Sequence, residues 1–310
     1  MDSKDRYIAR VLFQNKVYRS DGQAYEDLFV SVMTKANPNF RPVKPQGKFG
    51  DRKNDGWDQQ SGIYYQVYAP EDASQKEKDA IAKLDEDFNG LRAFWEAISP
   101  IKEFYFVLND KYKGAYASLE EALSKIKAKH SLSAAAPFLA KDLENTVFVL
   151  KDDEIFTVIG HVPSPDKIEN LQYAVLNDVI DHLLKSALPV GRADILKAPD
   201  FDEKIKFNKL SDGVSALLTT GSFQSGALDR YFELNSEFTK ENIKNVFSSL
   251  YAASLLTYAH IQDDAKNDHV FFEILNRALP VGGVVQQSAV LILMSHFFEA
   301  CDIFEAPVET

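Results

Sequence analysis

The sequence predicts an α/β domain followed by an all-helical domain. Two runs rich in β-branched and aromatic residues, 63–69 and 104–108, flank a long amphipathic segment at 74–98. A strand, a crossover helix and a second strand form a βαβ unit, so part of the sheet is expected to be parallel. Beyond residue 200 the strand patterns fade and helical periodicity dominates. We therefore expect residues 1–200 to form the α/β domain and residues 201–310 to form the helical one.

The other elements of the first domain follow from local patterns. Apolar residues at helical spacing predict a helix over 22–36 that ends at Asn37-Pro38. The stretch 38–62 contains three prolines and four glycines, which is typical of a loop or a short irregular strand pair. Further along we expect helices at 118–129, 138–150 and 166–186, a short strand at 154–159, and a linker at 189–199.

The second domain is read as a series of helices at 204–219, 225–234, 240–260, 268–278 and 284–304. Twelve of the 16 residues from Ala289 to Phe304 are apolar, too many for a helix with one exposed face. This last helix should therefore be buried in a bundle or against a partner protein. Polar replacements of Phe297 and Phe298 should abolish partner association or the fold itself.

Composition excludes several classes of protein. Hydrophobic residues make up 45% of the chain and charged residues 26%, as in ordinary globular proteins. The single cysteine, Cys301, cannot form an internal disulfide, and the CxxC and HExxH metal motifs are absent. The longest apolar run, 289–294, is far shorter than the roughly 20 residues of a membrane-spanning helix. Together with the polar start of the sequence, these features predict a cytoplasmic protein with no membrane segment.

Positive charge is concentrated near the N-terminus. The net charge is -11, yet residues 1–70 hold 11 Lys and Arg against 8 Asp and Glu. The stretch 35–53 carries six cations and one acid, whereas 207–310 carries 6 cations against 13 acids. This distribution favours an anionic ligand bound at one place over a protein that coats DNA along its whole surface.

A glycine-bounded turn, GDRKNDG at 50–56, contains the densest group of candidate catalytic and metal-binding residues. Asp51 and Asp55 lie four residues apart, and Gln66 and Tyr68 follow on one face of the next predicted strand. Carboxylate and amide oxygens are hard ligands of the kind that Mg²⁺ takes, and Glu26 on the preceding helix could face the same place. The alternative is that both aspartates only shape the turn and that Gln66 is a surface residue.

The order of Glu26, GDRKNDG and YYQVYAP (64–70) resembles the restriction-endonuclease-like PD-(D/E)xK nucleases, and most of all their Mrr-type branch. The resemblance covers roughly residues 13–110 and implies a mixed sheet with flanking helices. It also implies that Asp55, Gln66 and Glu26 hold Mg²⁺ or Mn²⁺, whereas Asp51 has a structural role.

Tyr68 stands where that family has a lysine, which would orient water and offset negative charge. A phenol with a pKa near 10 cannot act there as a cation. An active site would then need another cation, for which Lys48 and Lys53 are the nearest candidates and Lys48 is preferred. We expect the catalytic set to be Glu26, Asp55, Gln66 and Lys48, and the substrate to contact Lys44, Lys48, Arg52, Lys53 and Tyr68.

Two further segments, FYFVLNDKYKG (104–114) and FFEACDIFEAP (297–307), resemble nuclease-like proteins of the prokaryotic ABC-three-component conflict systems. This resemblance implies defence against phages or plasmids, with an ABC-type ATPase and a small middle component as partners. It also implies that the helical C-terminal domain docks partner subunits. Self-association into a homo-oligomer is compatible with the sequence.

Three interpretations compete. The first is a Mg²⁺-dependent DNA endonuclease fused to a partner-binding domain. The second is a catalytically inactive subunit with the same fold, which binds DNA or docks partner proteins. The third is a scaffold with no role in nucleic-acid binding. Divalent-ion dependence separates the first from the others, and salt-dependent DNA binding without cleavage would single out the second.

Overall fold

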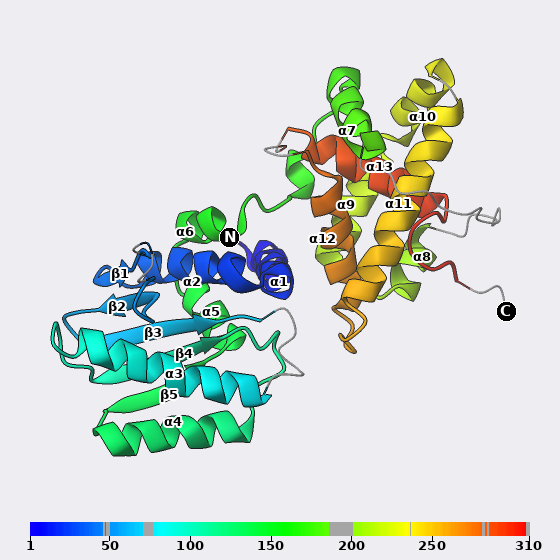
Figure 1. The fold of residues 1–310 in the computed structure, drawn as a ribbon. Helices are drawn as coiled ribbons and strands as arrows, with labels where there is room; N and C mark the ends of the chain where they lie inside the picture. The colour runs from blue at the N-terminus through cyan, green and yellow to red at the C-terminus, as the bar shows by residue number, and fades with distance from the viewer. Residues whose placement is uncertain are drawn as a thin grey trace. The chain divides into compact units, whose positions relative to one another are not determined.

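In the computed structural model the chain divides into two compact units (Figure 1). The sheet unit is Lys16–Gly160, and the helical unit joins Met1–Asn15 to His161–Thr310. This division falls at residue 160 rather than 200, and it assigns the start of the chain to the helical unit. The structure describes residues 1–45, 47, 50–70, 77–185, 201–235, 237–280, 283 and 285–307. The predicted linker at 189–199 lies outside these described residues.

The sheet unit contains a five-stranded mixed sheet in the order β1-β2-β3-β4-β5. Its first three strands pair antiparallel, and β3, β4 and β5 pair parallel. The predicted parallel βαβ unit is thereby confirmed, and the irregular strand pair within 38–62 consists of β1 and β2. The strands are β1 (Phe40–Pro42), β2 (Gly56–Asp58), β3 (Ile63–Tyr68), β4 (Glu103–Leu108) and β5 (Ala134–Phe138).

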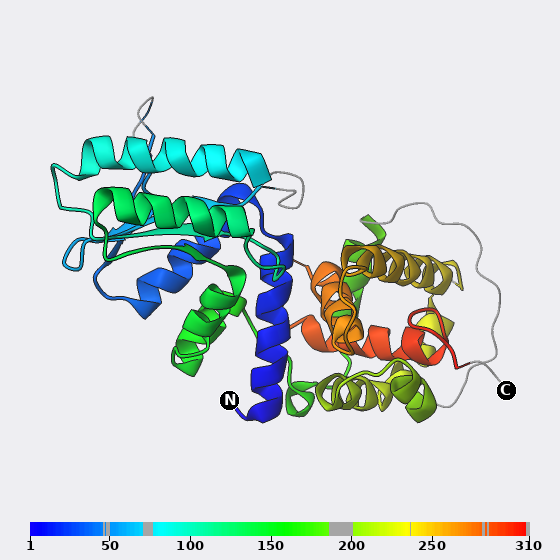
Figure 2. The ribbon, with the colours of Figure 1, turned by 90° about the horizontal axis from the view of Figure 1, so that it is seen from below.

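Helices cover both faces of this sheet (Figure 2). Helices α3 and α4 pack on one face, and α2 and α5 lie on the other. The parallel pairs account for α3 and α4, because each connects two parallel strands and must return the chain to the end of the sheet where the next strand begins. The helices of this unit are α2 (Gly22–Ala36), α3 (Glu77–Trp95), α4 (Ala117–His130), α5 (Ala140–Val147) and α6 (Asp152–Ile159).

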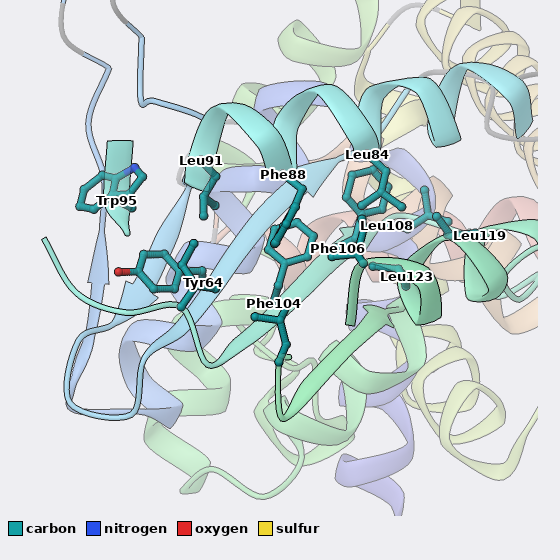
Figure 3. Packing of buried hydrophobic residues seen from close by; sticks show 13 residues of the cluster. Tyr64, Leu84, Phe88, Leu91, Trp95, Phe104, Phe106, Leu108, Leu119 and Leu123 are labelled. Carbon is teal, nitrogen blue, oxygen red and sulfur yellow. The ribbon is translucent and has the colours of Figure 1, made fainter. Parts of the chain in front are cut away.

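The core under α3 explains why this helix has a fixed place on the sheet (Figure 3). Alternate residues of β4, Phe104 and Phe106, are fully buried and point toward the helix. Phe88 packs against Phe104 edge to face, with the ring centroids 5.0 Å apart. Helix α3 contributes four core residues at helical spacing: Leu84, Phe88, Leu91 and Trp95.

Two elements of the sheet unit differ from the sequence prediction, and in the helical unit the helix expected over 204–219 is divided into two helices, Phe201–Phe207 and Asp212–Ser222. Residues 154–159, expected as a strand, belong to helix α6, and the prediction was wrong. Three acids open this helix, and the Glu154 carboxylate accepts the Lys151 N–H at 3.1 Å, so a favourable helix start outweighs the β-branched residues that follow. Strand β5 was not predicted, because its sequence AAAPF lacks strand-forming residues and depends on parallel pairing with β4.

The helical unit confirms the expected helical character of the C-terminal region. Helix α13 packs against α7, α9, α10, α11 and α12, and Phe297 and Phe298 are at most 1% exposed. Its apolar surplus is therefore buried within the unit, and these two phenylalanines are core residues. The helices are α7 (Tyr173–Lys185), α8 (Phe201–Phe207), α9 (Asp212–Ser222), α10 (Ser225–Leu234), α11 (Glu237–Thr257), α12 (Lys266–Ala278) and α13 (Gln287–Glu299), preceded by the 3-10 turn η3 (Pro165–Lys167).

The first helix, α1 (Ser3–Arg19), was not predicted, and its first part completes the helical unit. Asn15 is 2% exposed; its amide nitrogen donates to the His269 carbonyl at 3.1 Å, and its amide oxygen lies 2.6 Å from His269 Nδ1. The Tyr7 hydroxyl donates to Asp268 at 2.9 Å. The helix was not predicted because it buries side chains along two stripes, one formed by residues 8, 11 and 15 and the other by residues 9, 13 and 17. No single apolar face therefore stands out in the sequence.

Across the described segments of both units, we find no helix that combines the length and the hydropathy needed to cross a membrane.

Candidate functional site

The antiparallel pair β2 and β3 brings Asp55 close to the backbone on either side of Gln66. Gly56 pairs with Tyr65 at the end of this ladder, and Asp55 directly precedes Gly56. The Asp55 N–H donates to the Tyr65 carbonyl at 3.0 Å, and one of its carboxylate oxygens, Oδ2, accepts the Val67 N–H at 2.6 Å. These two contacts flank Gln66 on both sides. The structure therefore places the Asp55 carboxylate on the backbone next to Gln66, and the shared metal site that the sequence predicts for these two residues stays a prediction.

Gln66 carries an unsatisfied buried atom. Its side chain shares a face of β3 with Tyr64 and is mostly buried, with 6% of the residue exposed. Its amide nitrogen makes a long contact of 3.4 Å to the Val67 carbonyl, whereas its amide oxygen, Oε1, is buried without a hydrogen-bond partner. A buried acceptor without a donor is unfavourable. A bound cation or a hydrogen-bond donor would satisfy this oxygen.

Two acids at this place, Asp55 and Glu26, have raised pKa values. Burial, opposed by the Val67 N–H and reinforced by Glu26 and Asp51, raises the pKa of Asp55 to about 8. Burial also raises the pKa of Glu26, with a further contribution from Asp51. The site therefore favours a bound proton or cation over three free negative charges.

The donor set fits a hard divalent cation with few protein ligands. Within the part of the chain that the structure describes, no group of three or more His, Cys, Asp and Glu is arranged to hold a metal ion. Asp55, Gln66 and Glu26, the three ligands that the sequence predicts, stay candidate ligands: burial raises the pKa of both carboxyls, and Gln66 Oε1 is buried without a hydrogen-bond partner. Mg²⁺ usually keeps several waters and takes one or two carboxylates, which suits this arrangement.

The structure ties two of the predicted substrate-binding cations to helix α3. Lys53 forms ion pairs with Glu86 at 2.8 Å and Asp87 at 2.9 Å, and these partners raise its pKa. The Arg52 guanidinium carbon lies 4.9 Å from the centre of the Phe94 ring. Both side chains are thus engaged on the helix beside the turn.

The remaining predicted residues have different surroundings. Tyr68 stacks on Phe106, with the ring centroids 5.7 Å apart, and packs against the core under α3. Lys44 is exposed, and Lys48 lies outside the described residues. Sequence analysis missed Asp87, because nothing in the charged pattern of α3 separates it from the other acids of that helix.

One comparison with known proteins bears on the helical unit. Residues 174–305 match the family model of C-terminal domain 10 of the ABC-three component (ABC-3C) systems. No curated protein and no solved structure matches the chain. The resemblance to ABC-3C proteins that the sequence indicated is thus supported for the CTD10 region.

The CTD10 region extends from α7 to just beyond α13, and further parts of the chain complete its bundle. The helical unit includes Met1–Asn15, which lie outside the matched residues. The match also leaves out the sheet unit and therefore does not identify the fold that holds Asp55 and Gln66. With 11 cations against 18 acids in 174–305, the CTD10 region is poorly suited to hold phosphates.

Proposed function

We propose that the protein is a Mg²⁺- or Mn²⁺-dependent DNA endonuclease that acts as the effector of an ABC-3C system. The observation that supports this proposal is the buried Gln66 Oε1 without a hydrogen-bond partner, next in sequence to Val67, whose N–H holds the buried Asp55 carboxylate. In this proposal the CTD10 region docks the ABC-type ATPase and the small middle component in the cytoplasm. The biological role is defence against phages or plasmids.

In this proposal each residue of the site has a role in metal binding or in DNA contact. Asp55, Gln66 and Glu26 ligate the metal. The Val67 N–H fixes the Asp55 carboxylate. Asp51 adds negative charge, which favours a divalent over a monovalent cation. When bound, the metal polarises the phosphodiester and activates water for in-line attack. Lys44 and Lys48 belong to the basic stretch and would contact the DNA backbone.

A second candidate function rests on Tyr68. Its ring stacks on Phe106 at the position where the nuclease family has its lysine. If no other cation replaces that lysine, the sheet unit is a catalytically inactive nuclease fold that binds DNA or docks partner proteins. Lys48 is the preferred replacement, because Lys53 is paired with Glu86 and Asp87.

Plasmid cleavage in the presence of the partner proteins tests these functions. Wild type should cut with Mg²⁺ or Mn²⁺ and stop when EDTA is added. Asp55→Ala should abolish cleavage, and Lys48→Ala should weaken it. Asp27→Ala is the matched control, since it removes an acid next to Glu26 without replacing a proposed ligand, and it should cut normally.

Two outcomes contradict the nuclease proposal. If wild type does not cleave the plasmid and Tyr68→Lys gains metal-dependent cleavage, the protein is a nuclease fold that has lost its catalytic activity. If neither protein cuts and neither binds DNA in a salt-dependent manner, the sheet unit acts as a scaffold.

A further inference from the structure

The turn that carries Asp51 and leads into Asp55 has an unfavourable backbone. Arg52 and Lys53 both have positive φ values, 60° and 63°. Residues other than glycine seldom adopt this left-handed region, and two in succession are rarer still. Inside the turn, the Asp51 carboxylate accepts the Lys53 N–H at 2.7 Å. A turn of this kind holds one geometry only when its surroundings support it.

Helix α3 gives that support. The Lys53 ammonium lies 2.9 Å from Asp87 Oδ1 and 2.8 Å from Glu86 Oε1. The Asp87 side chain has no exposed surface, so this ion pair is shielded from water on one side. Gly90 lets the lysine stem lie across the helix, because a Cβ there would come within 3.0 Å of Lys53 Cγ. One turn further along α3, Arg52 lies over Phe94.

Asp87 holds two cations with one oxygen. Lys83 Nζ also lies 2.9 Å from Asp87 Oδ1, and the second oxygen, Oδ2, is buried without a hydrogen-bond partner. Lys83 belongs to α3 itself, so its contact does not hold the turn. The contact with Lys53, by contrast, joins the turn to a helix that the core fixes on the sheet.

We propose that Asp87 is a positioning residue which, through Lys53, holds Asp51 and Asp55 in the geometry that binds a divalent cation. The inference rests on the proposed metal site and extends it to a helix outside the motif. It also gives Lys53 a different task from the phosphate contact expected from the sequence.

Mn²⁺ titration calorimetry on the full chain tests the proposal. Asp87→Asn and Lys53→Met should each weaken Mn²⁺ binding by about tenfold or more, as is typical when support for a metal ligand is removed. Lys53→Arg keeps the charge and should bind like wild type. Lys83→Met is the matched control, because it removes the other cation from the same carboxylate and should leave Mn²⁺ affinity unchanged.

A double variant separates positioning from other roles. Lys53→Met and Asp87→Asn act on one contact, so the double variant should bind Mn²⁺ no more weakly than either single variant. If Lys83→Met weakens Mn²⁺ binding as much as Lys53→Met, Asp87 has only a structural role and the proposal is overturned. It is also overturned if Lys53→Met lowers DNA affinity while Asp87→Asn leaves both DNA and Mn²⁺ affinity intact.

Hydrogen exchange distinguishes this inference from the proposed function. If wild type itself does not bind Mn²⁺, the metal site fails, but the support of the turn can still be measured. Amide exchange across 50–56 should then be about tenfold faster in Asp87→Asn and Lys53→Met than in wild type, and unchanged in Lys83→Met. Equal exchange in all four proteins would overturn the inference.

Discussion

Replacing Asp55 by asparagine should stabilise the sheet unit near and above neutral pH, although it removes the proposed metal ligand. The Asp55 carboxyl is 3% exposed, and burial, with help from Glu26 and Asp51, raises its pKa to about 8. In the unfolded chain the same group has a pKa of about 3.9. Asparagine has nearly the same shape, stays neutral, and keeps an oxygen for the Val67 N–H.

The sign and size follow from proton linkage. Between pH 4 and pH 8 the folded state holds a proton that the unfolded state has released, so the free energy of unfolding falls as pH rises. The contribution of protonated Asp55 is complete below the unfolded pKa and is lost as pH rises to the folded pKa. Each pH unit costs about 1.4 kcal/mol, which gives a loss of about 4 kcal/mol between pH 5 and pH 8.

Both tryptophans of the chain make this measurable, because Trp57 and Trp95 lie in the sheet unit. Urea unfolding followed by tryptophan fluorescence without divalent ions should show a falling stability for wild type from pH 5 to pH 8. The curve for Asp55→Asn should be flatter, and the variant should be the more stable protein at pH 8. Equal slopes for the two proteins, or a less stable variant at pH 8, would refute the reasoning.

Two packing predictions follow from buried positions. Gly56→Ala should destabilise the sheet unit by about 1–3 kcal/mol, because a Cβ there would overlap the Phe40 ring. Gly226→Ala has open space around it and should be neutral or stabilising by up to about 1 kcal/mol. Both are measured by urea unfolding followed by circular dichroism. Phe298→Ala should cost the helical unit about 3–5 kcal/mol, whereas Phe223→Ala, at a position that is 78% exposed, should change its melting by little. Equal effects within either pair would contradict the packing described above.

Local patterns predicted those elements whose stability is decided locally. The helix 225–234 was predicted with the bounds that α10 has, and the two central strands were found from their β-branched and aromatic residues. Strand β5 exists because β4 offers it a parallel edge, which its own sequence does not reveal. The two buried stripes of α1 blurred the single apolar face on which helix prediction depends.

The candidate site likewise has features that the sequence reveals and features that depend on distant parts of the chain. That Asp55 lies against the strand of Gln66 could be predicted, because turn and strand follow each other closely in the sequence. The partners of Lys53 could not, since Asp87 lies 34 residues further along and looks like any other acid on a charged helix. The raised pKa of Asp55 was equally hidden, because it depends on burial that only the packed sheet provides.

The helical unit draws its core from segments made at very different times during synthesis. Asn15 and His269 are separated by 254 residues, so at typical rates of translation about 10–50 s pass between them. During that interval Ile8 and Val11, which are 2% exposed in the folded unit, have no finished bundle to enter. The sheet unit can fold while the chain is still growing, whereas the helical unit must wait. Among the segments of the helical unit, the first helix therefore waits longest for the residues that bury it.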